Sequence, residues 1–146
     1  MNIRELEITD LDAVSVLFDQ YRVFYRKKSD VESAKLFLSE RLSQGESEVF
    51  VCEYENKIVG FVQLYPLFSS TRMKKLWLLN DLFVNSNYRG KGISVKLIER
   101  AKKLVRETGA FGMFLETEKS NDIGNNLYPR TGFELNKASN YYEWIK

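Results

Sequence analysis

The chain has 146 residues, of which 44% are apolar and 29% charged, and this size and composition indicate one globular domain and exclude an intrinsically disordered protein. A net charge of +2 is too small for the broad basic surface of a nucleic-acid-binding protein, and one Cys without any His provides neither a zinc site nor an internal disulfide. Because no apolar run approaches the roughly 20 residues of a membrane span, and residues 1–10 do not have the pattern of a signal peptide, we expect one cytoplasmic domain over residues 1–146.

The N-terminal part predicts one strand and two helices. Residues 1–8 alternate as an edge strand does, and apolar positions at three- and four-residue steps predict a helix over residues 11–25. Ser29 and Glu32 have the spacing of a capping box, so a second helix is expected to begin there and to end near Gly45.

The central part predicts a sheet. Residues 47–54 and 57–68 are rich in β-formers and flank a short turn, which indicates an antiparallel hairpin, and residues 74–84 predict a third, mostly buried strand. The period then changes to a helical one over residues 93–106, and residues 111–118 return to a strand pattern. Strand, helix and strand form a βαβ unit, whose two strands should be parallel. A short helix over residues 121–130 and a last strand within residues 140–146 are expected to complete the chain.

The turn "NYRGKGIS" joins the third strand to the most regular helix and suits an anion. A helix start leaves about four backbone N–H groups without partners and carries roughly half a positive charge. Gly90 and Gly92 let the backbone approach a phosphate, and Arg89 and Lys91 add positive charge. The spacing is neither that of a Walker A loop nor that of a dinucleotide-binding GxGxxG turn. On spacing alone, a pyrophosphate site and a solvated loop before a helix both remain open.

Two stretches resemble motifs of the Gcn5-related N-acetyltransferases (GNAT). "NDLFVNSNYRGKGISVKLIERA" is similar to the central motif, in which an Arg or Gln, two residues, Gly, one residue, and Gly or Ala hold the pyrophosphate of coenzyme A. The residues in these places are Arg89, Gly90, Lys91, Gly92, Ile93 and Ser94, with Ser94 replacing the usual Gly or Ala. "NDIGNNLYPRTGFE" is similar to a later motif, with Asn121, Leu127, Tyr128, Gly132 and Phe133 in matching places. The likeness covers essentially the whole chain, which looks like the bacterial branch often labelled histone-acetyltransferase-HPA2-related.

The resemblance implies a fold and a cosubstrate. The fold is α/β (an α+β mixed sheet), mostly antiparallel, with a central parallel pair of strands that splay apart and with helices flanking the sheet. Acetyl-CoA lies in the gap between the splayed strands in this family. The backbone of Leu82, Phe83 and Val84 would hold its pantetheine arm, the glycine turn its pyrophosphate, and Asn121 and Tyr128 would also lie on the coenzyme side. No metal is implied.

The resemblance also implies direct acetyl transfer to a primary amine of a small molecule, a polyamine, a peptide or a protein. Tyr128 is the candidate general acid for the leaving thiolate, and the alternative is a core aromatic residue, because Pro129 and Gly124 depart from the family pattern. Asp81 is the candidate base, and the alternative is a structural carboxylate that caps neighbouring backbone. Cys52 lies mid-strand and is expected to be a core residue, not a nucleophile.

The acceptor side is expected to involve Tyr21, Arg22, Tyr25 and Asn80, the last at a position where many relatives have Glu. The alternative for the helix residues is simple packing. Two other functions stay open: a non-catalytic, coenzyme-A-binding regulatory module, and a relative that uses a longer acyl thioester. Neither a nucleic acid nor a membrane is expected as a partner. Because relatives often form homodimers, the aromatic segment 140–146 is expected to contact a second copy of the chain.

Overall fold

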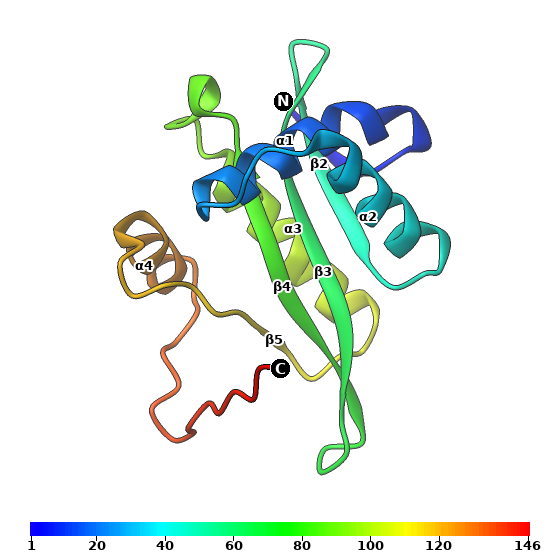
Figure 1. The fold of residues 1–146 in the computed structure, drawn as a ribbon. Coiled ribbons are helices and arrows are strands. Elements are labelled where there is room, and N and C mark those ends of the chain that lie inside the picture. Colours follow the sequence, from blue (N-terminus) through cyan, green and yellow to red (C-terminus); the bar gives the residue numbers. More distant parts are fainter. The chain divides into compact units, whose positions relative to one another are not determined.

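The computed structural model describes residues 1–146, which form two compact units, residues 1–116 and residues 117–146 (Figure 1). The first unit contains a five-stranded sheet with helices packed on it, and the second contains one helix, α4 (Asp122–Arg130), and the C-terminal segment. No helix in either unit combines the length and the apolar character that a membrane crossing needs.

The sheet of the first unit has the strand order β1-β2-β3-β4-β5, and all neighbours are antiparallel except β4 and β5, which are parallel. This confirms the predicted edge strand, the hairpin and the βαβ unit. The elements of the unit are, in chain order, β1 (Asn2–Glu5), η1 (Ile8–Asp10), α1 (Leu11–Phe24), α2 (Val31–Ser43), β2 (Glu48–Tyr54), β3 (Lys57–Ser69), β4 (Lys74–Val84), η2 (Ser86–Tyr88), α3 (Ile93–Glu107) and β5 (Met113–Phe114).

Helices cover both faces of this sheet, with α1 and α2 on one face and α3 on the other (Figure 1). On the first face, Val14 and Phe18 of α1 and Leu38 of α2 pack with Phe61 of β3 in one apolar cluster. The apolar stripe of α3 is buried as well, and its members are Ile93, Leu97, Ile98, Ala101 and Leu104. Full burial of a side chain of this size stabilises a fold by about 1.5–3 kcal/mol, so these two layers define the core.

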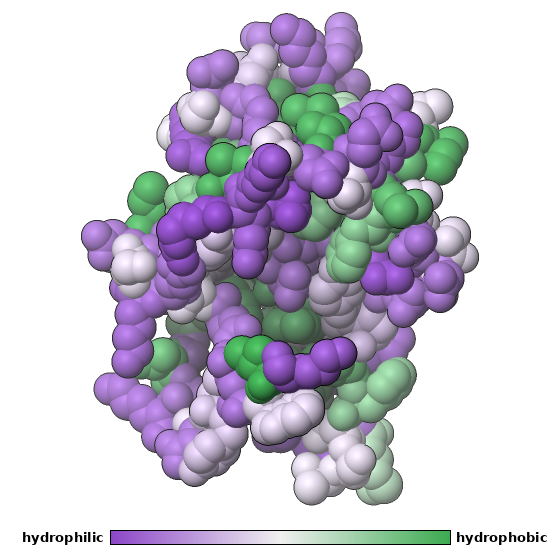
Figure 2. All heavy atoms as spheres, viewed as in Figure 1, coloured by the Kyte–Doolittle hydropathy of each residue, from purple (hydrophilic) through white to green (hydrophobic).

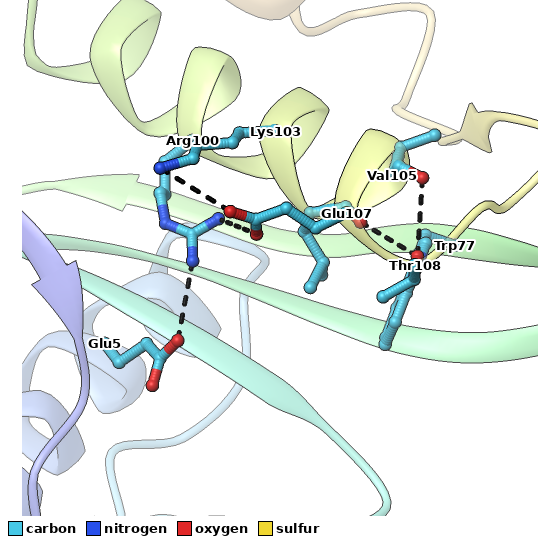
Figure 3. A network of polar contacts seen from close by, with 8 residues as sticks. Glu5, Trp77, Arg100, Lys103, Val105, Glu107 and Thr108 are labelled. Atoms are coloured by element: carbon cyan, nitrogen blue, oxygen red, sulfur yellow. Dashed lines mark hydrogen bonds and ion pairs between the residues drawn. The ribbon is translucent and has the colours of Figure 1, made fainter.

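Polar contacts fix the C-terminal end of α3 against the sheet (Figure 3). The indole N–H of Trp77 on β4 donates to the Thr108 hydroxyl at 2.9 Å. Arg100 pairs with Glu107 at 3.3 Å and with Glu5 of β1 at 3.5 Å. Anchored in this way, α3 runs back across the sheet and its N-terminal end lies directly after the turn that leaves β4.

The outer surface of α1 and α2 is not uniformly polar. Hydrophobic residues stand among hydrophilic ones on this face of the molecule (Figure 2). Partly exposed apolar residues of the two helices include Val16, Val23, Phe24, Leu36 and Phe37. Singly exposed apolar side chains are common on folded proteins, so they do not indicate a binding site on this surface.

The predicted start of the second helix is wrong by one residue. The N-cap of α2 is Asp30, whose carboxylate accepts from the Ser33 backbone N–H at 3.1 Å, and no capping box joins Ser29 to Glu32. The reason is Asp19 on α1, a buried carboxylate that accepts from the Ser29 hydroxyl at 2.6 Å and from the Asp30 backbone N–H at 2.7 Å. The Ser29 side chain, which the local pattern assigned to capping, is therefore bound to Asp19 of another helix instead.

Two predicted strands differ from the structure. The strand expected over residues 111–118 is reduced to Met113–Phe114, because only these residues pair with β4. The strand expected within residues 140–146 is wrong, since the chain after α4 forms no regular element. A strand needs a pairing partner, and the second unit contains no other strand.

Candidate active site

The parallel pair of strands is joined over a short distance only. β4 and β5 pair through Trp77 with Met113 and Leu78 with Phe114. The C-terminal part of β4, residues 79–84, has no strand beside it on this edge, whereas its other edge continues to pair with β3. The predicted backbone contacts to a cosubstrate, at Leu82, Phe83 and Val84, fall in this open stretch. An extended molecule with amide groups would find backbone hydrogen-bonding groups there.

A β-bulge lies at the beginning of the open stretch. Gln63 on β3 is opposite Asp81, and the next pair is Leu64 with Leu79, so Asn80 is an extra residue in β4. A bulge of this kind re-aims side chains and is frequent beside active sites. Asn80 is exposed, whereas Asp81 is only 3% exposed, so the two neighbouring predicted residues face different environments.

Asp81 is held by amide donors. Its Oδ2 accepts from Nε2 of Gln63 at 2.5 Å, and its Oδ1 accepts from Nδ2 of Asn80 at 3.2 Å. Burial raises the pKa of Asp81 from the ordinary 3.8 to about 6, and hydrogen bonds from Gln63, Asn80 and Tyr21 lower it by less than burial raises it. A carboxylate with a pKa near 6 is mostly ionised at neutral pH yet close enough to take up a proton, which suits a general base.

Tyr21 brings the end of α1 to this carboxylate. Its hydroxyl donates to the backbone oxygen of Asn80 at 3.0 Å, and its hydrogen bond to Asp81 contributes to the pKa of that group. The ring of Tyr21 packs edge-on against Tyr25, with 5.0 Å between centroids, and against Phe83, with 6.5 Å. Tyr21 therefore connects Tyr25 and Asn80 beside Asp81, and these three residues form one wall next to that carboxylate.

Arg22, the other residue predicted on the acceptor side, has different partners. Its guanidinium donates to the backbone oxygen of Lys28 at 3.4 Å and lies 3.6 Å from the Asp19 carboxylate. These contacts fasten the connection between α1 and α2. These polar partners of Arg22 thus lie in this connection and not at Asp81.

The glycine turn places open backbone at the start of α3. Gly90 and Gly92 have φ values of 76° and 75°, a left-handed conformation that favours glycine, and a Cβ at either position would meet no atom within 4 Å. Gly92 is the N-cap of α3, and no side chain caps the helix. Ile93 is buried and fixes the first turn, and Ser94 follows it half-exposed. The first turn of α3 contains no acidic residue, so its unpaired backbone N–H groups and the positive end of the helix dipole are together suited to bind an anion.

The two basic residues of the turn rest on aromatic rings. Nε of Arg89 donates to the Val84 backbone oxygen at 3.1 Å, and its guanidinium lies 5.6 Å from the centre of the Phe83 ring. Nζ of Lys91 lies 5.7 Å from the centre of the Tyr54 ring. Arg89 thus connects the end of the open β4 stretch to the glycine turn.

The second unit contains the remaining predicted residues. The Asn121 side chain caps α4 by accepting from the Gly124 backbone N–H at 3.1 Å. A Cβ at Gly124 would lie 2.7 Å from Nδ2 of Asn121 and 3.2 Å from the Tyr128 ring, which explains why glycine stands there. Pro129 lies in the last turn and α4 ends directly after it at Arg130, so Tyr128 keeps its helical position and packs edge-on against Phe133 at 5.7 Å.

Cys52 is a core residue, as predicted. It is fully buried in β2, and burial raises the pKa of its thiol, which makes it a poor nucleophile.

The sequence motifs did not indicate Gln63 as a site residue. A lone amide side chain in the apolar run "IVGFVQLY" was the available signal, but its partner across the sheet depends on a register that the sequence does not display. No group of three or more His, Cys, Asp or Glu side chains is placed to hold a metal ion.

Comparison with known proteins identifies the class. The profile described as "Acetyltransferase (GNAT) family" matches residues 12–133. The chain is 41% identical over 142 residues to the uncharacterized N-acetyltransferase YhfO of Bacillus subtilis, which covers 97% of this chain and 95% of that protein. Together with the mixed sheet, these matches define an acetyltransferase. The chain belongs to the GNAT family.

Solved structures agree with this assignment. The crystal structure of a probable acetyltransferase superposes with a TM-score of 0.95 at 33% identity, over 100% of this chain and 98% of that chain. An aminoglycoside acetyltransferase, meta-AAC0020 from an uncultured soil metagenomic sample, in complex with sisomicin, superposes with a TM-score of 0.81 at 27% identity, over 99% of this chain and 96% of that chain.

Proposed function

We propose that the chain is an amine N-acetyltransferase, which moves an acetyl group from acetyl-CoA directly to a primary amine. The observation that carries this proposal is the continuity of the open β4 stretch, residues 79–84, with the glycine turn at the start of α3. The first offers polar backbone to an amide-containing chain, and the second offers N–H groups to a pyrophosphate. Coenzyme A contains these two chemical parts in this order.

The residues assigned to the cosubstrate follow from that match. Backbone groups of Leu82, Phe83 and Val84 bind the pantetheine arm. The pyrophosphate is bound by the glycine turn, whose members are Arg89, Gly90, Lys91, Gly92, Ile93 and Ser94. Asn121 and Tyr128 are assigned to the coenzyme side from the family motif that they match.

The proposed reaction needs one base and one acid. An acceptor amine with a pKa near 10.4 is only about 0.1% neutral at pH 7.4, so a base must remove a proton from its ammonium form. Asp81, with its pKa of about 6, takes that proton. The amine nitrogen then attacks the thioester carbonyl carbon, the C–S bond breaks, and Tyr128 donates its phenol proton to the departing thiolate. The attacking nitrogen loses its second proton as the amide forms, and this proton restores the Tyr128 phenol, while the proton on Asp81 is released to solvent. Backbone N–H groups of β4 stabilise the charge that develops on the carbonyl oxygen.

The acceptor is a primary amine of a small molecule, a polyamine, or a peptide or protein. Tyr21, Tyr25 and Asn80 form its wall, with Arg22 behind them, and aromatic faces attract an ammonium group. The resemblance to an aminoglycoside acetyltransferase supports an amine acceptor, because aminoglycosides carry several amino groups.

The test separates binding from chemistry. Calorimetry with acetyl-CoA measures binding, and a thiol-release assay over a panel of amines measures turnover. Binding with turnover on at least one amine is the expected result. Binding without turnover on any amine would favour a coenzyme-A-binding regulatory module instead, and faster turnover with propionyl- or butyryl-CoA would change the assigned acyl group. Absence of binding would remove the proposal.

A further inference from the structure

Gln63 is an unusual residue for the centre of a sheet. It is fully buried on β3, between apolar neighbours, and Nε2 donates to Oδ2 of Asp81 at 2.5 Å. Its other polar atom, Oε1, is buried without any hydrogen-bond partner. Buried polar atoms are nearly always paired, because leaving one unpaired is unfavourable. A methionine of similar size would avoid this loss, so packing does not account for the glutamine.

What the glutamine provides is one donor to one carboxylate. The groups that face Asp81 are Tyr21 from α1, Gln63 and Tyr65 from β3, and Asn80 from its own strand. None of them is a cation. Burial and the charge of Asp81 raise the pKa of Tyr65, so this phenol stays neutral. Asp81 is therefore the group of this cluster that titrates near neutral pH.

We propose that Gln63 is a positioning residue for Asp81, whose buried amide N–H orients the carboxylate and keeps it ionised for proton uptake. This inference rests on the proposed function of Asp81 as the base. A neutral donor offsets part of the cost of burying the charge, whereas a lysine or arginine at the same place would hold the carboxylate ionised too firmly to accept a proton. The amide forms and breaks no covalent bond, and the proton passes from the acceptor amine to Asp81.

The first experiment needs no substrate. The side-chain carboxyl carbon of Asp81 is followed by ¹³C NMR as pH changes, with its signal assigned by loss in Asp81→Asn. We expect a midpoint near 6 in the parent protein and a midpoint higher by about one pH unit or more in Gln63→Met, because a charge-assisted hydrogen bond is lost. Gln44→Met, the same substitution at an exposed position at the end of α2, should leave the midpoint unchanged. An unchanged midpoint in folded Gln63→Met would overturn the proposal.

If Gln63→Met does not fold, a second variant tests the same contact. Gln63→Glu keeps the shape of the side chain and places a carboxyl group beside Asp81. Two carboxyl groups that share one proton titrate in two steps, and the upper step should lie above the parent midpoint. Two steps at or below the parent midpoint would contradict a direct contact between positions 63 and 81.

Kinetics then distinguish this inference from the proposed function. In Gln63→Met the acid limb of kcat/KM should move upward by the same amount as the NMR midpoint, with the rate at high pH largely kept. If the NMR midpoint moves and the acid limb does not, the base assignment is wrong and Gln63 acts on a carboxylate outside the reaction. If neither moves, the role of Gln63 itself is wrong.

Discussion

The buried carboxylate of Asp81 lowers the free energy of unfolding at neutral pH, because its charged form is disfavoured inside the sheet. Its pKa is about 6 in the folded protein, and its ordinary value, 3.8, applies to the unfolded chain. The folded protein therefore binds this proton more tightly, so the contribution of Asp81 to stability is most favourable below about pH 4 and declines as pH rises to about 6. A difference of roughly two pKa units corresponds to about 3 kcal/mol.

Replacing Asp81 by Asn should raise the free energy of unfolding at neutral pH and abolish acetyl transfer. The free energy of unfolding of Asp81→Asn should exceed that of the parent by an amount that grows from about pH 4 to above pH 6, toward about 3 kcal/mol, because the neutral amide does not titrate. Urea unfolding at a series of pH values measures the difference, and thiol release measures activity. A difference that stays constant with pH would show that the carboxylate does not titrate in this range.

Tyr128 is expected to act as the proton donor to the leaving thiolate. Its ring packs against Phe133, so Tyr128→Phe keeps that contact and the affinity for coenzyme A while it removes the phenol proton. General acid catalysis contributes typically 10² to 10⁴ in rate, and kcat should fall by a factor in this range. The acid limb of the pH profile should remain, because it reports the base and the amine. Turnover at the parental rate, where acetyl transfer is limiting, would make Tyr128 a packing residue.

The elements that hold the site differ in how far the sequence predicts them. The hairpin, the βαβ unit and α3 follow from residue periodicity, because each buries one continuous apolar face. The start of α2 does not, because buried Asp19 captures Ser29 from outside the helix. The shortness of β5 and the contact between Gln63 and Asp81 depend on strand separation and register, which are tertiary properties.

The same limit applies to the candidate site. The glycine turn, Asp81 and Tyr128 were found because short motifs place them. Gly124 looked like a departure from the family pattern, and only the position of the Asn121 amide and the Tyr128 ring explains it. Sequence motifs thus locate the residues, and packing decides what each one contacts.

The N-terminal end of α3 is expected to bind the pyrophosphate of coenzyme A. Gly92→Glu places a carboxylate at the helix start. There it would repel a pyrophosphate and would itself interact with the positive end of the helix dipole. Coenzyme A should raise the Tm of the parent protein and leave the Tm of this variant unchanged. Gly109→Glu is the matched control: Gly109 also has a positive φ, 62°, and open space around its Cβ position, but it lies after the other end of α3. Equal protection of Gly92→Glu and the control would remove the pyrophosphate assignment.

The C-terminal segment, residues 140–146, carries several large exposed apolar side chains. Tyr142, Trp144 and Ile145 are each more than 80% exposed. Aromatic and β-branched residues in sequence favour strand pairing, but the segment forms no strand within its own unit. We propose that it pairs or packs with a second copy of the chain, because burial of several large apolar side chains favours association.

Two measurements test the proposed homodimer: the mass of the intact chain, and the mass of a chain that lacks residues 140–146. Light scattering should give twice the monomer mass of 17.1 kDa for the intact chain, and a chain shortened by residues 140–146 should give the monomer mass. Leu135→Ser is the control, because Leu135 is equally exposed yet lies outside the segment, and this variant should remain dimeric. The thermal stability of the shortened chain should become independent of protein concentration, whereas that of the intact chain should rise with it, since association stabilises the folded form by mass action. A monomer mass for the intact chain at high concentration would refute the homodimer, and a dimer that persists without residues 140–146 would place its interface elsewhere.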